Sequence, residues 1–214
     1  MYKKKPFFIV FEGVEGCGKS FQSKKLFNNL KKNSIDAVLT REPGGTKSSE
    51  LIRNLILKDY FNKNSKEKFD KYTDTLLYLA ARNEHVKNKI KPALNKKKVV
   101  ICDRFTDSTI AYQVDGKKVD INFINNIHKK ILEGLKPNIV FILKVSSKSS
   151  KSRLIKRKTK NRYDNFAQSF YAKAQRSFIK LSKNKKNYFV LDSSSNNNIL
   201  EKKIFSIVNK YLKT

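Results

Sequence analysis

Residues 13–20 read Gly13-Val14-Glu15-Gly16-Cys17-Gly18-Lys19-Ser20. Two glycines enclose four residues and are followed by Lys and Ser, which is the P-loop pattern. The apolar stretch Phe7 to Phe11 precedes this segment, and a stretch with helical periodicity follows it. Glycines let backbone N–H groups curl around phosphate oxygens, and the start of the following helix adds positive potential. We therefore expect all eight residues to form the phosphate-binding loop of an ATP site.

A second element of a phosphate site follows further along the chain. The apolar stretch Val99 to Asp103 ends in a carboxylate, and in open α/β folds ligands collect at the carboxyl ends of the strands. In a P-loop protein the Lys reaches the β- and γ-phosphates, while the hydroxyl after it and a strand-ending Asp serve Mg²⁺. We expect these roles for Lys19, Ser20 and Asp103, the last acting directly or through water.

The order of apolar and helical stretches indicates the fold class. Five nearly all-apolar stretches are expected to be strands buried on both faces of a parallel sheet: Phe7 to Phe11, Asp36 to Thr40, Val99 to Asp103, Ile139 to Val145 and Tyr188 to Leu191. The stretches expected to be helices are Ser20 to Lys32, Leu51 to Phe61, Tyr72 to Leu94, Phe123 to Leu135, Asp164 to Ser182 and Ile199 to Leu212. Their alternation predicts an α/β fold with a five-stranded parallel sheet flanked by helices, in one domain over residues 1–214.

The stretch from Lys148 to Arg162 differs from the rest of the chain. It is rich in Lys and Arg, and Leu154 and Ile155 are its only apolar residues. This composition disfavours permanent burial, because each charged group would have to leave water. We expect a mobile basic flap, or lid, over about residues 148–163, with a solvated run of charge as the alternative.

The chain carries 48 Lys and Arg against 18 Asp and Glu, a formal net charge of +30. Such an excess suits a nucleic-acid-binding face, because clustered cations neutralise phosphates and release counterions. Here the lysines are scattered in short runs, with neither zinc-ligand spacing nor an RNA-binding aromatic signature. We expect a solvated surface with weak, salt-dependent attraction for polyanions and no specific nucleic-acid partner. An ATP-dependent switch protein that binds nucleic acid is the alternative from another functional class.

Cysteine usage and hydropathy bear on the compartment. Cys17 and Cys102 are too few for a disulfide framework. The run Phe7 to Phe11 is too short for a signal-peptide core, and no stretch approaches the ~18 apolar residues that a membrane span requires. We expect a cytoplasmic protein with no membrane association.

Three further segments indicate the acceptor of the phosphoryl group. They read Thr40-Arg41-Glu42-Pro43-Gly44-Gly45-Thr46, Leu76-Leu77-Tyr78-Leu79-Ala80-Ala81-Arg82, and Asp103-Arg104-Phe105-Thr106-Asp107-Ser108-Thr109 with Ala111-Tyr112-Gln113. Together with Phe11-Glu12-Gly13, they resemble the bacterial thymidylate kinases from about Phe7 to Leu212. The resemblance implies a P-loop nucleoside monophosphate kinase fold, phosphorylation of dTMP by ATP in dTTP biosynthesis, and a homodimer. The nearest alternative, a P-loop kinase for another monophosphate or a shikimate-like alcohol, would lack these segments in combination.

The resemblance assigns the acceptor phosphate to three arginines, Arg53, Arg82 and Arg104. Guanidinium forks suit phosphate oxygens, and the acceptor phosphate carries about two negative charges. Arg82 lies one helical turn after Tyr78, so both side chains can face one cavity. For Arg53 the alternative is a solvated residue on the surface of a helix.

The resemblance also implies how the nucleoside is held. Tyr78 matches an aromatic position, usually Phe, that stacks on thymine, with an ordinary core position as the alternative. Thr109 and Gln113 match positions that contact the base edge, and an amide offers the donor and the acceptor that thymine requires. Glu15 would accept a hydrogen bond from the sugar 3′-OH, and Glu42 would help to arrange the same region. The hydroxyl of Tyr78, and Thr109 where Ser is frequent, both bear on base preference.

Phosphoryl transfer requires positioning and neutralisation of the charge that spreads over the transferred group. In the resembled family the arginine that does this lies either in the P-loop or in the lid. The variable positions of the P-loop hold no Arg here, so the candidates are Arg153, Arg157 and Arg162 of the flap. The expected catalytic set is Lys19 and Arg104 together with Arg157 and Arg162.

Overall fold

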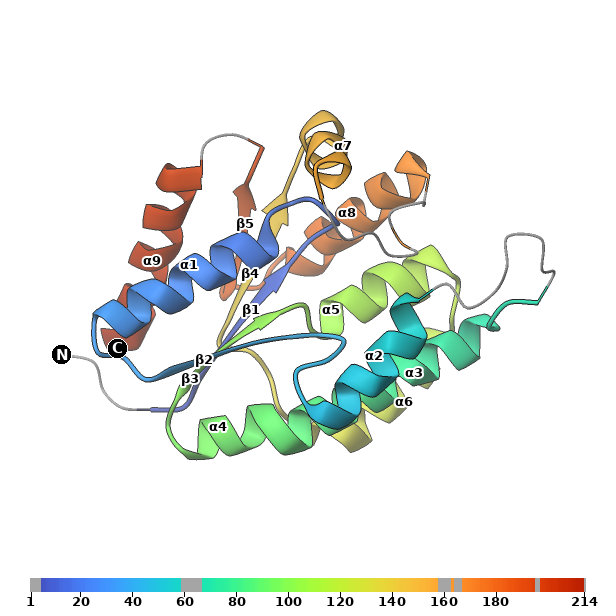
Figure 1. Cartoon of the computed structure of the whole chain (residues 1–214), viewed down its shortest axis with the longest axis horizontal. Coiled ribbons are helices and arrows are strands. Elements are labelled where there is room, and N and C mark those ends of the chain that lie inside the picture. Colours follow the sequence, from blue (N-terminus) through green and yellow to red (C-terminus); the bar gives the residue numbers. More distant parts are fainter. Residues whose placement is uncertain (1–4, 59–66, 158–162, 164–166, 195–196, 214) are drawn as a thin grey trace.

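A parallel sheet lies at the centre of the computed structural model, which describes residues 5–58, 67–157, 163, 167–194 and 197–213. Its five strands have the order β2-β3-β1-β4-β5 (Figure 1). The strands are β1 Phe7–Glu12, β2 Ala37–Arg41, β3 Val99–Asp103, β4 Ile139–Lys144 and β5 Tyr188–Asp192. The five strands expected from the sequence are confirmed, and their bounds differ from expectation by at most one residue at either end. The expectation that all five are buried on both faces is wrong for β2 and β5, which are partly exposed because they lie at the two edges of the sheet.

Burial explains why these stretches form strands. Every residue of β1 and of β3 is buried, because helices cover both faces of the sheet. In the pairing of β1 with β3, Phe11 lies opposite Asp103, so the P-loop and this carboxylate start from one edge. The chain passes from β3 on one side of β1 to β4 on the other. The carboxyl end of β1 is therefore a topological switch point, where α/β folds bind their ligands.

Helices cover both faces of the sheet. They are α1 Lys19–Lys32, α2 Lys47–Leu57, α3 Lys71–His85, α4 Lys91–Asn95, α5 Thr106–Thr109, α6 Ile121–Leu132, α7 Ser147–Ile155, α8 Gln168–Ser182 and α9 Asn197–Lys213, with π-helical turns η1 Val86–Ile90 and η2 Ile110–Gly116. Among the described helices, none has the length and apolar character needed to cross a membrane.

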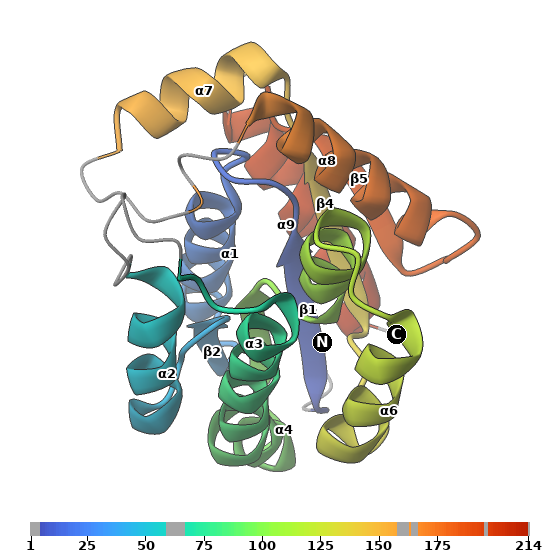
Figure 2. The ribbon, with the colours of Figure 1, turned by 90° about the vertical axis from the view of Figure 1, so that its right-hand side faces the viewer.

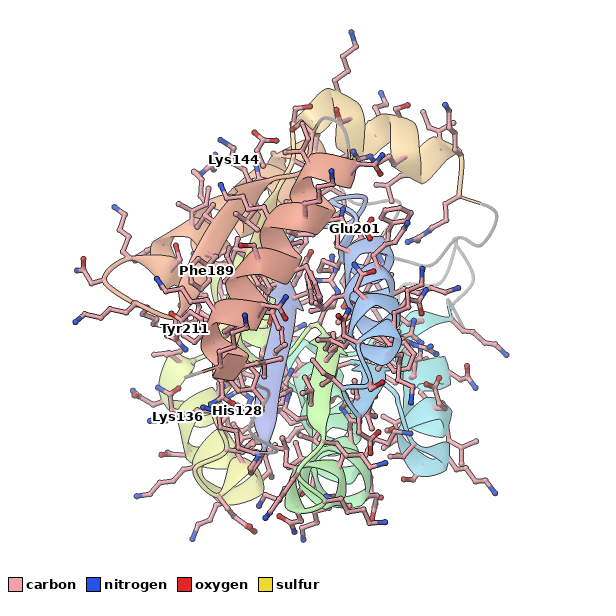
Figure 3. All side chains as sticks on the ribbon, turned by 90° about the vertical axis from the view of Figure 1, so that its left-hand side faces the viewer. His128, Lys136, Lys144, Phe189, Glu201 and Tyr211 are labelled. Atoms are coloured by element: carbon pink, nitrogen blue, oxygen red, sulfur yellow. The ribbon has the colours of Figure 1, made fainter. Side chains whose placement is uncertain are left out.

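The helices α1 and α9 lie side by side on one face (Figure 1). Glu201 of α9 accepts a hydrogen bond from Asn29 of α1 at 2.9 Å. Tyr211 of α9 lies against Phe189 of β5, with ring centroids 6.0 Å apart (Figure 3). On the other face α3 contacts α2 and α6, while α8 packs on η2, β4 and β5. This second face carries the segments that resemble a nucleotide acceptor site.

The stretch expected as one helix from Tyr72 to Leu94 is helical but not uniform. It comprises α3, the π-helical turn η1 at Val86–Ile90 and α4. Pro92 lies just beyond this turn, where it has no N–H to donate and its ring crowds the carbonyl four residues earlier. A widened turn accommodates the proline without ending the helix.

Several expected helix bounds differ from the structure; the helix expected from Phe123 to Leu135, for example, is α6 at Ile121–Leu132. The helix expected from Leu51 begins earlier, as α2, because Thr46 caps it and accepts a hydrogen bond from the N–H of Ser49 at 3.2 Å. Residues 59–66, which include the end expected for that helix, lie outside the described residues. The helix α8 begins at Gln168, and residues 164–166 of the expectation also lie outside the described part.

The basic stretch after β4 makes closer contact with the fold than its composition indicates. Its first part forms α7, which crosses above the loop that joins β1 to α1 (Figure 2). Ser150 is buried and donates to the carbonyl oxygen of Glu15 at 2.8 Å, and Arg153 donates to that of Gly16 at 3.2 Å. Of the described residues 148–157 only Ser150 is buried, so α7 lies on the P-loop, whose carbonyls its polar groups satisfy, and not in the hydrophobic core. This agrees with the expectation that the stretch is not permanently buried, and its mobility stays a prediction. Residues 158–162, Arg162 among them, lie outside the described part.

Candidate active site

The P-loop joins β1 to α1 and is held from inside by Lys19. The Lys19 ammonium group donates to the carbonyl oxygens of Gly13 at 2.9 Å and Val14 at 2.8 Å. Gly16 has a φ of +70°, and a Cβ atom there would lie 2.7 Å from the carbonyl oxygen of Ser150 on α7. Only glycine fits this close approach. Lys19 thus places a cation beside the loop at the start of α1, and a cation at the N-terminal end of a helix suits the binding of an anion.

Ser20 and Asp103 meet at the same edge of the sheet. The Ser20 hydroxyl donates to the Asp103 carboxylate in a short hydrogen bond. Oxygen donors of this kind are what Mg²⁺ prefers, and in phosphotransferases one or two protein oxygens complete a shell supplied mostly by phosphates and water. The pair therefore fits the metal role expected for it.

A cavity of about 420 Å³ opens at this edge. Small-molecule sites typically measure ~300–1,000 Å³. The expected site residues on its wall are Glu15, Gly16, Gly18, Lys19, Ser20, Glu42, Arg53, Tyr78, Arg82, Asp103, Arg104, Thr109, Gln113 and Arg157. Gly13, Val14 and Cys17 are buried behind this wall. The structure thus brings the P-loop and the expected acceptor residues into one space.

Arg104 links the P-loop to the acceptor side of the cavity. Its guanidinium group donates to the carbonyl oxygen of Gly13 at 3.0 Å and to Glu15 at 2.7 Å. The other Glu15 oxygen accepts from the hydroxyl of Tyr112 at 2.5 Å. Burial raises the pKa of Glu15, but the Arg104 and Lys19 cations outweigh it and hold the pKa below its ordinary value. Glu15 is therefore an ionised acceptor at neutral pH.

Arg82 is the most heavily bonded of the expected arginines. It is 3% exposed, and its Nε donates to Glu42 at 2.7 Å. One Nη donates to Thr109 at 2.6 Å and lies 2.8 Å from Nε2 of His128, while the other donates to the carbonyl oxygen of Phe105 at 2.9 Å. Most donors of this guanidinium group are thus engaged by the protein, which fixes its orientation.

Glu42 ties Arg82 to the loop after β2. One carboxylate oxygen pairs with Arg82, and the other lies 3.1 Å from Nδ1 of His85. Nε2 of His85 lies 2.6 Å from the Thr40 hydroxyl. Burial raises the pKa of Glu42, but the Arg82 cation and the His85 hydrogen bond outweigh it and lower the pKa. A Cβ atom at Gly45, which has a φ of +97°, would lie 2.6 Å from His85, so this loop is packed tightly on α3.

His128 contacts Arg82 as a neutral acceptor. Burial and the Arg82 cation lower its pKa from 6.5 to about 3. The ring is therefore uncharged at neutral pH, and its Nε2 accepts from Arg82. Neither His85 nor His128 has a partner in the sequence pattern, because their contacts come from elements far apart in the chain.

Two residues expected from the resemblance, Arg53 and Tyr78, reach the cavity from the neighbouring helices α2 and α3. Arg53 is 25% exposed and donates to the carbonyl oxygen of Pro43 at 2.5 Å, so it faces the loop after β2. Tyr78 is half-buried, and its hydroxyl donates to that of Tyr163 at 2.5 Å. The ring of Tyr163 also packs edge-on against Tyr112 at 6.0 Å between centroids. Tyr112 and Tyr163 are cavity residues to which the sequence assigned no role.

The residues expected to contact the base edge lie deeper. Thr109 and Gln113 are both 2% exposed and line the cavity beside Arg82. Both lie on the helical segment formed by α5 and η2, and the π-helical turns of η2 begin between them. The structure therefore brings these two side chains to the same end of the cavity.

The flap arginines reach the cavity from α7. Arg153 lines it and donates to the carbonyl oxygens of Gly16 at 3.2 Å and Ser193 at 2.7 Å. Arg157 also lines the cavity, two residues beyond α7. Of the three flap arginines, Arg153 and Arg157 therefore line the cavity, and Arg162 lies outside the described residues.

Comparisons with known proteins match one family along nearly the whole chain. The family model described as thymidylate kinase matches residues 11–204. The thymidylate kinase of Wolbachia pipientis subsp. Culex pipiens is 39% identical over 208 residues, 95% of this chain and 96% of the relative. That of Aster yellows witches'-broom phytoplasma is 39% identical over 210 residues, 96% of each. The crystal structure of thymidylate kinase from Ehrlichia chaffeensis superimposes with a TM-score of 0.74 at 31% identity, covering 95% of this chain and 99% of that one.

Proposed function

The chain belongs to the thymidylate kinase family, and we propose how its cavity carries out that family's reaction. As a member, it is an ATP-dependent nucleoside monophosphate kinase that transfers the γ-phosphoryl group of ATP to dTMP, giving dTDP and ADP. An oxygen of the dTMP phosphate attacks the γ-phosphorus while the bond to the departing ADP oxygen breaks. The observation that supports this use of the site is that the P-loop and Arg104 share one cavity.

The donor half of the site is the P-loop. Its backbone N–H groups hold the triphosphate, and the Lys19 ammonium group turns from the carbonyls of Gly13 and Val14 to the β- and γ-phosphates. Ser20 and Asp103 would hold Mg²⁺, which would supply positive charge to neutralise the phosphates of ATP.

The acceptor phosphate is held by Arg104 and Arg53. Arg104 donates to the P-loop carbonyl of Gly13 and lines the cavity, which supports a role for its guanidinium group between the donor and acceptor phosphates. Arg53 lines the same cavity from α2, and its positive charge assists. The phosphate would replace part of the pairing between Arg104 and Glu15.

Arg82 takes a different role from the phosphate contact that the resemblance implied. It bonds to Thr109 and is almost fully buried, so it lies at the end of the cavity where Gln113 also lies. We assign Arg82, Thr109 and Gln113 to the edge of the thymine base and the ring of Tyr78 to its face. Glu15 accepts from the sugar 3′-OH, and Glu42 acts by orienting Arg82.

The flap arginines complete the site. Arg157, with Arg153 beside it and Arg162 further along the chain, stabilises charge on the phosphoryl group in transit. In this proposal the segment of about residues 148–163 acts as a lid that excludes water while ATP is bound.

The exposed apolar residues of α2, α3 and α6 favour a homodimer. Leu51 and Leu55 on α2, Leu76 on α3 and Ile121 on α6 are all exposed, and these helices lie next to one another. Burying this face against a second copy of the chain would remove apolar surface from water. The two free, buried cysteines suit a reducing compartment, and we place the protein in the cytoplasm as one domain over residues 1–214.

An acceptor panel tests the assignment. ADP release from ATP and Mg²⁺ is measured with dTMP, dUMP, dCMP or AMP as the acceptor, and dTMP should give the highest kcat/KM. Preference for another acceptor would favour a different P-loop kinase. ATPase activity that nucleic acid stimulates, without turnover of any monophosphate, would instead favour a nucleic-acid switch.

A further inference from the structure

A buried carboxylate lies directly behind the site without reaching the cavity. Glu12 is the last residue of β1, whose other residues are all apolar, and it is 0% exposed. It pairs in register with Ile142 of β4, so it lies in the middle of the sheet. An ionisable group at such a position is costly unless it is hydrogen-bonded, so its partners indicate why it is there.

The partners of Glu12 all belong to the segment that follows Arg104. One carboxylate oxygen accepts from the backbone N–H of Phe105 at 2.8 Å and from that of Ser108 at 3.2 Å. The other oxygen accepts from the Ser108 hydroxyl at 2.6 Å. One side chain of β1 thus anchors both the start and the middle of the turn from β3 into α5.

Arg104 has a backbone conformation that requires such support. Its φ is +74°, in the left-handed region of backbone conformation that residues other than glycine rarely adopt. Its own N–H donates to the carbonyl oxygen of Phe11 at 2.8 Å, and the next N–H donates to Glu12. Consecutive residues of β1 therefore hold the backbone on both sides of the strained residue, and such conformations persist where the surroundings over-determine them.

The same carboxylate is linked to the side chain of Arg104. The guanidinium group donates to the Ser108 hydroxyl at 3.1 Å, and that hydroxyl donates to Glu12. A hydroxyl that must accept from the arginine is oriented by donating its own hydrogen to a carboxylate. Hydrogen bonds to Glu12 thus support both the backbone next to Arg104 and, through Ser108, its side chain.

We propose that Glu12 is a positioning residue for phosphoryl transfer, which sets the backbone and the guanidinium direction of Arg104 without touching either substrate. This inference rests on the proposed role of Arg104 in holding the acceptor phosphate. Glu12 does not line the cavity, so its loss acts on dTMP through Arg104 and leaves the P-loop contacts with ATP in place.

The surroundings of Glu12 supply a readout that a merely structural carboxylate would lack. Burial and the neighbouring Asp107 carboxylate raise its pKa to about 7, although Ser108 and Arg104 oppose this. Cys102 on β3 and Tyr188 on β5 also face it. Below pH 7 a proton on Glu12 competes with the hydrogen that the Ser108 hydroxyl donates, so the link to Arg104 weakens. Use of dTMP should therefore improve as pH rises through about 7.

The test compares Glu12→Gln with Asp74→Asn, a matched change at another buried carboxylate that is paired with Lys117 and lies off the cavity. At pH 8, Glu12→Gln should lower kcat/KM for dTMP about tenfold or more, the scale of a lost hydrogen bond to a charged group. KM for ATP should change less than about twofold, and the deficit should shrink as pH falls below 7. Asp74→Asn should leave both substrate constants near wild type at every pH, whatever it does to Tm.

Three results would overturn the proposal: equal losses in the two variants, a parallel rise in KM for ATP, or a wild-type-to-Gln ratio that does not vary with pH. If Glu12→Gln does not fold, Ser108→Ala provides the second test, because it removes the relay and keeps the backbone anchors. It should raise KM for dTMP by a smaller factor, and an unchanged KM would contradict the relay. Arg104→Ala distinguishes a failure of the role proposed for Arg104 from a failure of the role proposed for Glu12. An unaffected KM for dTMP in Arg104→Ala would refute the role of Arg104.

Discussion

Replacing Glu42 by Gln should be strongly destabilising, because it breaks a buried ion pair at one end. The Arg82–Glu42 contact measures 2.7 Å, and the two side chains are 3% and 4% exposed. The amide of Gln keeps one oxygen, which can accept from Arg82 or from His85 but not from both. Its NH₂ group would face the other donor, and the Arg82 charge would lose its counterion in a buried site.

Removing one partner of a buried pair typically costs about 3–5 kcal/mol, and the oxygen that Gln retains places this change near 3 kcal/mol. For a chain of this length, 1 kcal/mol corresponds to a shift of ~2–4 °C, so Tm should fall by about 6–12 °C. The change should also raise KM for dTMP, because Arg82 loses the contact that orients its guanidinium group towards the base.

Urea unfolding at pH 7.5 measures the free energy, and Asp36→Asn is the matched control. Asp36 pairs with Lys98 at 3.1 Å, but its side chain is 59% exposed, so its loss should cost less than about 1 kcal/mol. If Glu42→Gln cost no more than Asp36→Asn, with unchanged m-values, the ion pair would not anchor the acceptor side as described.

Three further predictions follow from contacts at the cavity. Arg157→Ala, alone and with Arg162→Ala, should lower kcat by at least ~10-fold with little change in KM, and kcat within a few-fold of wild type would refute the flap role. Tyr78→Phe removes the hydroxyl that meets Tyr163 and keeps the ring, so isothermal titration should show dTMP affinity within about tenfold of wild type; a larger loss would show that the hydroxyl, rather than stacking, dominates. The pKa of His128 is lowered to about 3 in the folded chain, so between pH 6.5 and about 3 the unfolded chain binds a proton that the folded chain does not. This residue therefore makes the free energy of unfolding fall as pH falls through that window. His128→Gln should remove that contribution in urea titrations at pH 4 to 7, and an unchanged slope would contradict it.

The fold was predictable to the extent that the strands are buried on both faces. Such burial makes β1 and β3 almost wholly apolar, a pattern that differs from alternation and from helical periodicity. The P-loop was equally predictable, because its glycines and Lys19 lie within eight consecutive residues. Both features are defined by residues that lie close together in the sequence, so the sequence alone predicts them.

Contacts between distant segments were not predictable in the same way. His128 meets Arg82 across 46 positions, and Tyr112 meets Glu15 across 97, so no periodicity relates them. The α7 helix was missed because its composition is that of a solvated stretch, whereas Ser150 and Arg153 satisfy carbonyls of the P-loop. Glu12 did leave a signal, since a carboxylate ending an otherwise apolar strand needs buried partners.

The measurement that bears most directly on the site is calorimetric binding of a two-substrate ligand, in which adenosine and thymidine are joined through a polyphosphate chain. If the P-loop and Arg104 serve one continuous cavity, the joined ligand should bind at least ~100-fold more tightly than ATP or dTMP alone, because its second half binds at high effective concentration. Arg104→Ala should remove most of that gain and should lower the affinity for ATP by a much smaller factor, because Arg104 also contacts Gly13 and Glu15 of the P-loop. A joined ligand that binds no more tightly than ATP would contradict adjoining donor and acceptor sites.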